Sequence, residues 1–325
     1  MVNQLKIQTM RKELFYLIIF IFLISGCQED AVDFPYFDVL AKDSTEVVVK
    51  AKEPIIFELE GNPDMLYFYS GETGKRYEYA GRVSAIGIPY LQFTSYRANG
   101  KQEGSLRLMI SQDFPGITVG DAVATVSKIS SATWTDITDR ALLSSGTTMN
   151  SGAIDLSDFA QTGKPVFIAF KYLAQAGSIQ NKWTISALTV KNTLPDGTVY
   201  TIANTTNTAI TNYGVATVFS PGWVFFPVIN TYSWGLSSNN LVITGATSVS
   251  SATDMSEAWA IMGPVDLTKV TPDVGLFLKG LDTRLENYSY TYNVAGTYTA
   301  TFIGVADNVY GKKELVKQVK IKVNP

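Results

Sequence analysis

Thr297-Tyr-Thr-Ala-Thr-Phe302 alternates a threonine with an aromatic or apolar residue at every second position. Side chains along a β-strand point alternately to the two faces of a sheet, so Tyr298, Ala300 and Phe302 share one face. The threonines then share the opposite face. This segment therefore predicts a strand with one buried and one solvent-facing side, as in an antiparallel sandwich.

The same two-residue period extends over the rest of the chain from residue 34 onward. Breaks at Gly, Pro, Asn or Asp come about every ten residues, as expected for short strands joined by turns. We find no long stretch with a helical period. We therefore predict an all-β fold, and the length of 325 residues suggests two domains. The clearest further strands are residues 106–110, 166–172 and 319–323.

The N-terminus has the features of an export signal. Lys6, Arg11 and Lys12 precede an apolar run over residues 14–24, which is shorter than the roughly 20 residues that span a bilayer. The tetrad Ile24-Ser-Gly-Cys27 follows directly and resembles a bacterial lipobox, in which a peptidase cuts before a cysteine that carries lipid. The alternative is an ordinary secretory signal with an incidental cysteine.

Cys27 is the only cysteine of the chain, so neither an internal disulfide nor a thiolate metal cluster can form. We predict that Cys27 is lipidated and anchors the protein to a membrane. Gln28-Glu-Asp30 follows it and resembles the acidic export signal of Bacteroidota lipoproteins. This resemblance implies a lipid anchor in the outer membrane, with the protein facing the extracellular side.

The composition argues against several classes of activity. The chain has no histidine, which is the commonest general base and metal ligand. Its formal net charge of −3 gives no basic footprint for nucleic acid. We find no phosphate-binding loop, no dinucleotide fingerprint and no nucleophile motif. We therefore predict a protein that is not an enzyme and has no catalytic residues.

The C-terminal region resembles one half of a PKD-like, immunoglobulin-type sandwich. In that family an aromatic-rich strand turns at a small-residue-Gly pair and enters a strand of the form Tyr-x-Val-x-Leu, as residues 288–302 do. The matching first half resembles residues 46–80 instead. There, Met65-Leu-Tyr-Phe-Tyr-Ser-Gly-Glu-Thr-Gly74 occupies the position of the family's Trp-Asp-Phe-Gly-Asp-Gly turn, without its paired aspartates.

The middle of the chain is similar to jelly-roll modules of the cleaved-adhesin and MAM-like type. The similarity rests on the order of four segments and on a fifth, residues 257–267, which comes first in those modules and late here. That displacement suggests a permuted or doubled arrangement. The four segments are Ala132-Thr-Trp-Thr-Asp-Ile137, Ser151-Gly-Ala-Ile-Asp-Leu-Ser-Asp-Phe159, Lys164-Pro-Val-Phe-Ile-Ala-Phe-Lys-Tyr172 and Lys182-Trp-Thr-Ile-Ser-Ala-Leu-Thr-Val190.

These resemblances predict a jelly-roll inserted in, or adjacent to, the PKD-like sandwich, because insertions succeed at exposed loop tips. The expected boundaries are a signal peptide over 1–26, a lipidated linker over 27–33, the split sandwich over 34–84 plus 268–325, and the jelly-roll over 85–267. The whole resembles an uncharacterised Bacteroidota surface-lipoprotein family, a domain of unknown function found among glycan-utilisation genes.

Exposed aromatic rings are the expected feature of a glycan-binding site, because they stack on the apolar faces of sugars. Trp134, Trp183 and Trp259 match jelly-roll strands, which favours core packing. Two tryptophans stand apart in segments rich in Pro, Gly and Asn, which suggests a loop or an edge. The alternative is that these two fold back onto the sheet. The predicted sugar platform consists of Trp223, Trp234, Tyr232 and Tyr213.

We therefore predict a non-enzymatic surface lipoprotein that holds a polysaccharide or oligosaccharide for a neighbouring outer-membrane transporter or hydrolase. The alternative is a surface adhesin or structural protein that recognises another protein. No cofactor and no metal site are predicted. Since jelly-rolls of this kind often hold a structural calcium ion, Asp113 or Asp155 would be its ligands, but no EF-hand spacing is present.

Overall fold

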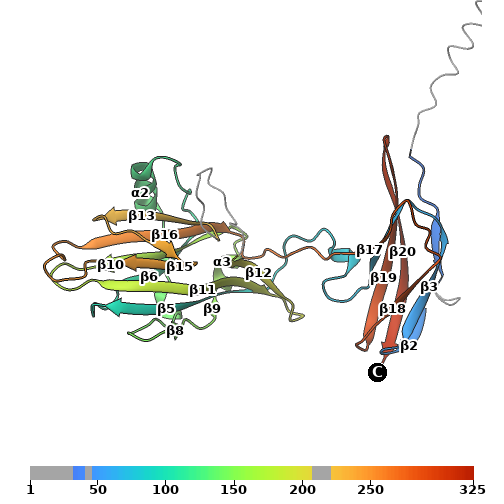
Figure 1. The fold of residues 1–325 in the computed structure, drawn as a ribbon, viewed down its shortest axis with the longest axis horizontal. Coiled ribbons are helices and arrows are strands. Elements are labelled where there is room, and N and C mark those ends of the chain that lie inside the picture. The colour runs from blue at the N-terminus through green and yellow to red at the C-terminus, as the bar shows by residue number, and fades with distance from the viewer. Residues whose placement is uncertain (1–31, 41–45, 207–220) are drawn as a thin grey trace, which may run out of the picture. The chain divides into compact units, whose positions relative to one another are not determined.

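The computed structural model describes residues 32–40, 46–206 and 221–325. The chain divides into two units, of which the first is Met1–Ala80 with Asp273–Pro325 and the second is Gly81–Pro272. The second unit is thus inserted within the first (Figure 1). Its ends lie four residues before and five residues after the expected boundaries of 85 and 267. Both units consist of stacked β-sheets, which confirms the all-β sandwich fold.

The first unit, which we call the Ig-type unit, has two sheets. Sheet A has the order β1-β3-β18, and sheet B has the order β17-β4-β19-β20-β2. A short 3₁₀ helix, η1 (Tyr77–Tyr79), follows β4. The strands are β1 (Phe37–Leu40), β2 (Glu46–Lys50), β3 (Pro54–Gly61), β4 (Met65–Tyr69), β17 (Leu276–Lys279), β18 (Asn287–Thr291), β19 (Gly296–Asn308) and β20 (Gly311–Asn324).

The pairing in this unit explains the sequence pattern of its last strand. β20 lies between β19, which is antiparallel to it, and β2, which is parallel. Val319, Ile321 and Val323 are buried, while Lys320 and Lys322 are exposed. The lysines therefore mark a solvent face of an interior strand and do not protect an edge.

A tyrosine at the start of β19 makes the hydrogen bond that is typical of immunoglobulin-type sandwiches. The Tyr298 hydroxyl donates to the carbonyl oxygen of Val294 over 2.8 Å, back across the corner between β18 and β19. Phe57, Phe68 and Phe302 meet between the two sheets, with ring centroids 4.9–5.9 Å apart. The core of this unit is therefore mainly aromatic.

The second unit, the jelly-roll unit, also has two principal sheets. Sheet C has the order β13-β16-β10-β6-β7, and sheet D has the order β14-β15-β11-β5-β8, with β12 paired to β11 and β9 to β5. The strands are β5 (Ile88–Asn99), β6 (Leu106–Ser111), β7 (Thr135–Asp136), β8 (Met149–Asn150), β9 (Ile154–Asp155), β10 (Val166–Ala174), β11 (Asn181–Thr193), β12 (Val199–Asn204), β13 (Trp223–Ile229), β14 (Gly235–Ser237), β15 (Asn240–Thr244) and β16 (Ser256–Val265).

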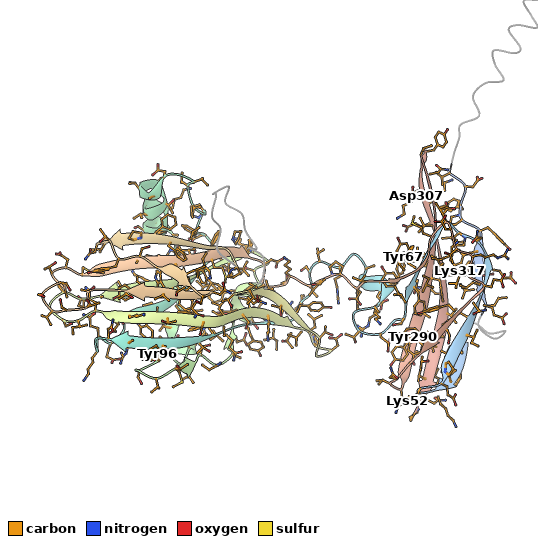
Figure 2. The ribbon with its side chains drawn as sticks, in the orientation of Figure 1. Lys52, Tyr67, Tyr96, Tyr290, Asp307 and Lys317 are labelled. Carbon is orange, nitrogen blue, oxygen red and sulfur yellow. The ribbon has the colours of Figure 1, made fainter. Side chains whose placement is uncertain are left out.

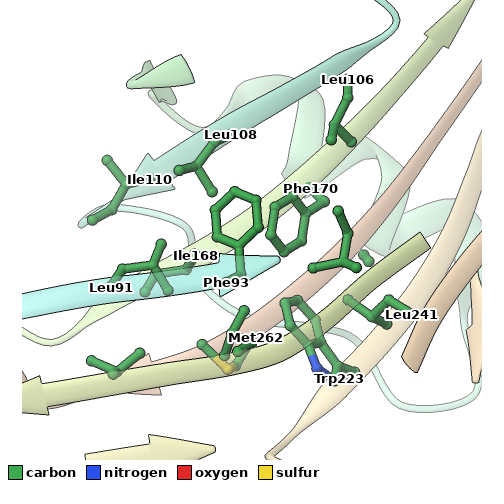
Figure 3. Packing of buried hydrophobic residues seen from close by; sticks show 14 of the residues in the cluster. Leu91, Phe93, Leu106, Leu108, Ile110, Ile168, Phe170, Trp223, Leu241 and Met262 are labelled. Atoms are coloured by element: carbon green, nitrogen blue, oxygen red, sulfur yellow. The ribbon is translucent and has the colours of Figure 1, made fainter. Parts of the chain in front are cut away.

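The chain passes repeatedly from one sheet of this unit to the other. β5 leads to β6, β10 to β11, β13 to β14 and β15 to β16, and each of these connections crosses between sheets D and C. The inward faces form one apolar core around Phe170, to which residues from both sheets contribute (Figure 3). We call these four connections the crossover loops. They determine which side chains lie close together at the rim of that core.

The outer face of sheet C carries a second, smaller cluster beside helix α2 (Ala122–Ser131). The Asp121 carboxylate accepts a hydrogen bond from the Ala124 backbone N–H over 2.8 Å and so caps the helix N-terminus. Ile129 of the helix packs in this cluster with Phe167 and Trp259 of the sheet. Two short helices complete the unit, η2 (Thr138–Arg140) and α3 (Ser157–Ala160). Among the described residues no helix has the length and apolar character needed to cross a membrane.

Candidate functional site

The crossover loops of the jelly-roll unit enclose a hollow of about 760 Å³. This volume lies within the roughly 300–1,000 Å³ that is typical of ligand sites. The loop after β5, the loop after β10 and the loop after β15 each contribute to its wall. The lining residues are Asn99, Gly100, Lys101, Gln102, Ser178, Ile179, Thr247 and Val249.

Side-chain amides tie these loops to one another. The Gln102 amide donates to the Ser178 hydroxyl over 2.7 Å and to the carbonyl oxygen of Gln175 over 2.9 Å. The Gln175 backbone N–H returns a hydrogen bond to the Gln102 side-chain oxygen over 2.9 Å. The fully buried Gln180 accepts from the Ala246 N–H over 2.9 Å and donates to the Asp254 carbonyl over 2.9 Å. The hollow is therefore held in shape before any ligand arrives.

Gly100 is the point of closest approach between two of the loops. A Cβ atom at this position would lie 2.1 Å from the carbonyl oxygen of Ile179 and 2.7 Å from Oδ1 of Asn181. Any larger residue would push the first loop away from the second. The Asn-Gly pair at 99–100 is a turn signal in the sequence, but the close approach depends on a loop about eighty residues further along the chain.

A buried polar cluster lies below the loops. The Asn181 amide nitrogen donates to the Ser105 hydroxyl and to the Gln102 carbonyl, both over 2.6 Å, and the Trp183 indole N–H donates to Ser105 over 2.9 Å. Oδ1 of Asn181 is buried and has no hydrogen-bond partner among the described residues. The Tyr172 hydroxyl donates to the carbonyl oxygen of Asn181 over 2.8 Å, and burial raises the pKa of Tyr172, so it remains a neutral donor.

The lining of the hollow suits the recognition of hydroxyl groups. Asn99, Lys101 and Thr247 supply hydrogen-bonding groups, while Ile179 and Val249 are exposed apolar side chains that fit the C–H faces of a sugar ring. Lys101 is the single charged residue of the lining set, and no carboxylate belongs to it. The arrangement provides hydrogen bonds and apolar contact, without a facing pair of acids.

Trp223 and Trp234 lie in an edge strand and in a loop, as predicted, but their side chains are buried, which agrees with the alternative that they fold back onto the sheet. Trp223 is 1% exposed and Trp234 is 3% exposed, and both pack against Phe170, as Figure 3 shows for Trp223. The Trp234 indole N–H donates to the Ala258 carbonyl over 3.2 Å. Trp223 does begin an edge strand, which tolerates Pro227, but its side chain points inward. Neither ring can stack on a sugar in this structure.

Of the other two residues of the predicted sugar platform, the structure describes one, Tyr232. Tyr232 is half-buried in the loop between β13 and β14, one of the four crossover loops. Tyr213 lies outside the described residues, as does Cys27, the predicted lipidation site. Sequence reasoning missed the residues of the hollow, because hydrogen-bonding side chains in three separate loops show no common pattern before the fold brings them together.

The remaining tryptophans lie near the positions that their strand patterns indicate. Trp183 is buried in the main core, and Trp259 is buried in the cluster beneath α2. Trp134 is half-buried, with its ring centroid 4.9 Å from that of Trp259. Lys171 and Glu257 form an ion pair at 3.2 Å beside this ring pair, and the Trp259 indole N–H donates to Glu257 over 2.7 Å.

The two aspartates considered as calcium ligands make local hydrogen bonds instead. Asp113 accepts from the Ser111 hydroxyl and from the Thr133 N–H, each over 2.9 Å, and these bonds lower the pKa of Asp113. Asp155 accepts from the Ser157 N–H over 2.8 Å. Within residues 32–40, 46–206 and 221–325, no group of three or more acidic, histidine or cysteine side chains could hold a metal ion.

Residues 26–210 match the protein family described as Domain of unknown function (DUF5017). The match covers more than half of the chain, so the protein belongs to this family. It covers most of the N-terminal part of the Ig-type unit and extends into the jelly-roll unit to just beyond the end of β12. We found no match among curated proteins or among solved structures.

Proposed function

We propose that the protein is a non-enzymatic surface lipoprotein that binds a polysaccharide or oligosaccharide in the hollow between the jelly-roll crossover loops. The single observation that carries the proposal is the lining of this hollow, in which amide, hydroxyl and ammonium groups surround two exposed aliphatic side chains. Sugars present hydroxyls and apolar C–H faces side by side, so such a lining matches them chemically.

The rigidity of the loops supports the same proposal. Ordering loops and side chains on binding costs free energy. A site that is already ordered avoids much of that cost. The amide contacts of Gln102 and Gln180 hold the three loops together in the absence of ligand. Tyr232, half-buried in the fourth crossover loop, is the aromatic residue of the predicted platform that we propose extends the surface for a longer chain of sugars.

Affinity electrophoresis and isothermal titration against a panel of polysaccharides test this function. We expect a retarded or titratable complex with at least one glycan, weakened at least about tenfold by Asn99→Gly combined with Lys101→Ala, because each lost hydrogen bond contributes about 0.5–1.5 kcal/mol. Asn99 has a positive φ of 57°, which glycine adopts without strain, so this variant removes the side chain and leaves the loop intact.

Lys164→Ala is the matched control, because Lys164 is an exposed lysine of the same unit that lines a different surface depression. It removes the same charge and should leave glycan affinity unchanged. Failure to bind any glycan of the panel, or equal affinity of both variants, would contradict the proposed site.

The surface location is part of the proposal and has its own test. A fatty-acid probe fed to cells should label the protein at Cys27, and Cys27→Ser should abolish labelling and release the protein from the outer membrane. An unlabelled wild-type protein would contradict the anchor. A neighbouring outer-membrane transporter that receives the glycan is the partner that this location suggests.

Recognition of another protein is the second candidate function, and one feature of the Ig-type unit favours it. Phe277, 53% exposed on the edge strand of sheet B, pairs with Tyr67 at a ring-centroid distance of 5.3 Å. Exposed aromatic residues are enriched at protein interfaces. Crosslinking on intact cells in the absence of sugar distinguishes the two functions, because only protein recognition predicts a stoichiometric partner that Phe277→Ser removes.

A further inference from the structure

The β19–β20 hairpin of the Ig-type unit ends in two apolar residues. Asn308 pairs with Gly311, and Val309 and Tyr310 form the turn between them. Val309 is 91% exposed and Tyr310 is 62% exposed. Two-residue hairpin turns normally carry Asn, Asp or Gly, whose backbones suit the turn and whose side chains tolerate water. An apolar pair at this position is therefore unexplained by the needs of the turn.

Figure 1 shows that the end of this hairpin extends beyond the other strands of the unit. Two more exposed aromatic residues lie in the segment that leads into β1, Phe34 at 67% and Tyr36 at 76% exposure. The Lys313 ammonium lies 4.7 Å from the centroid of the Phe34 ring, so this segment and the hairpin are adjacent. We call Phe34, Tyr36, Val309 and Tyr310 the apolar tip.

The first described residues pack against the end of the hairpin, which places the apolar tip close to the proposed anchor. Val32 is buried, and a Cβ atom placed on Gly311 would lie 3.7 Å from its side chain. Val32 is therefore packed against the hairpin end. Cys27 precedes it by five residues, which span at most about 17 Å when fully extended. A lipid on Cys27 would hold the apolar tip within that distance of the membrane surface.

Charged groups of both signs lie along the hairpin. Lys312, next to the turn, lies 2.6 Å from Glu314, and Lys317, labelled in Figure 2 and opposite Phe302, lies 3.2 Å from Asp38. Asp307, at the end of β19, accompanies them. This balance of charge does not favour adsorption by attraction to anionic lipid. It suits entry of aromatic and aliphatic side chains into the headgroup layer, where tyrosine is enriched and lysine stems extend toward water.

We propose that the apolar tip inserts into the lipid headgroup layer of the membrane that carries the anchor, as a second, non-covalent membrane contact. This inference rests on the proposed lipidation of Cys27. Together the acyl chains and the tip would fix one end of the Ig-type unit at the bilayer, where an anchor alone would leave it free to turn.

Site-specific labelling of the lipidated, full mature chain in phosphatidylcholine proteoliposomes tests the insertion. Because Cys27 is the only cysteine and its thiol would be acylated, Val309→Cys introduces a unique site for an environment-sensitive fluorophore. We expect its emission to shift to shorter wavelength, together with quenching by spin-labelled lipid. Ile86→Cys is the matched control, because Ile86 is 89% exposed in the jelly-roll unit, and its label should report water.

A label at Val309 that is as accessible to aqueous iodide as the label at Ile86 would overturn the proposal. So would a shift that occurs on intact cells and not in proteoliposomes, since that result would identify a protein partner. Loss of acylation is detected separately, from the mass of the mature chain. That result would contradict the proposed lipidation of Cys27 and not the insertion of the apolar tip.

A second measurement does not require the anchor. Flotation of the mature chain carrying Cys27→Ser with phosphatidylcholine vesicles should show weak binding. Val309→Ser with Tyr310→Ser should reduce it at least about tenfold, with little dependence on anionic lipid, because two apolar side chains leave the interface. No binding of the parent chain, or equal binding of both, would also overturn the proposal.

Discussion

The two sandwiches are stabilised by different kinds of core. The jelly-roll unit buries all five tryptophans of the chain at least in part, and both its sheets meet around Phe170. The Ig-type unit contains no tryptophan and relies on phenylalanines surrounded by tyrosines whose hydroxyls reach backbone oxygens.

Under the proposed function, this difference assigns recognition to one unit and support to the other. In the jelly-roll unit the polar network lies under an open hollow, where a ligand can use the ordered loops. In the Ig-type unit the tyrosine hydroxyls are engaged in holding the sandwich together. Substitutions around the hollow of the jelly-roll unit should therefore alter glycan affinity, and substitutions in the core of the Ig-type unit should alter stability without changing that affinity.

The largest effect is expected from the jelly-roll core. Trp223→Ala should lower the free energy of unfolding of that unit by about 3–5 kcal/mol, because a fully buried indole leaves a cavity. Tryptophan fluorescence during chemical denaturation reports this unit alone, since all tryptophans lie within it. Hydrogen exchange of peptides from 281–325 should stay unchanged. Val123→Ala, at an exposed helix position, should change stability by less than about 0.5 kcal/mol.

Gly100→Ala tests whether the loop contact shapes the hollow. The added Cβ atom would clash with the Ile179 carbonyl, so the loops must separate at a cost of about 1–3 kcal/mol. We expect lower stability of the jelly-roll unit and a loss of glycan affinity, measured by denaturation and titration. At Gly235 a Cβ atom would meet nothing within 4 Å, so Gly235→Ala is the control. Equal behaviour of the two variants would show that the close approach is unimportant.

Tyr292→Phe probes the rim of the Ig-type core. Its hydroxyl donates to the Ser70 carbonyl over 2.7 Å in a buried position, so the variant leaves that oxygen without a partner. We expect a loss of about 1–2 kcal/mol in the unfolding of this unit, by calorimetry, with glycan affinity unchanged. Tyr298→Phe removes a more exposed hydrogen bond and should have a smaller effect. A change in affinity would contradict the division of roles.

The smallest effect concerns the ion pair between Arg140 and Asp158, 2.8 Å apart on the jelly-roll surface. The hydrogen bond from Arg140 lowers the pKa of Asp158 below its ordinary 3.8. The folded state therefore gains stability above that value and loses it as the pH falls through the lowered pKa. Because both side chains are about one-third or more exposed, Asp158→Asn should cost under about 1 kcal/mol at pH 7, and the cost should shrink as the pH falls through the lowered pKa. A stability loss that does not shrink on acidification would indicate a packing effect.

The sequence was sufficient for the fold class because strand alternation is a local property. Tyr298, Ala300 and Phe302 face the core as their two-residue period requires. Local composition indicated a loop or an edge for Trp223, and the chain does form an edge strand there, but composition could not show that this strand buries its indole. The hollow could not be predicted, since its walls come from three loops whose proximity depends on sheet pairing across much of the chain.

The insertion of the jelly-roll unit has a mechanical consequence. Two peptide connections, one following β4 and one preceding β17, join it to the Ig-type unit, and these two strands are neighbours in sheet B. If the jelly-roll unit binds a glycan as proposed, tension on that polymer would be divided between two covalent paths and delivered to adjacent strands. A single proteolytic nick in either connection would leave the jelly-roll unit attached to the Ig-type unit, so releasing it would require two cuts.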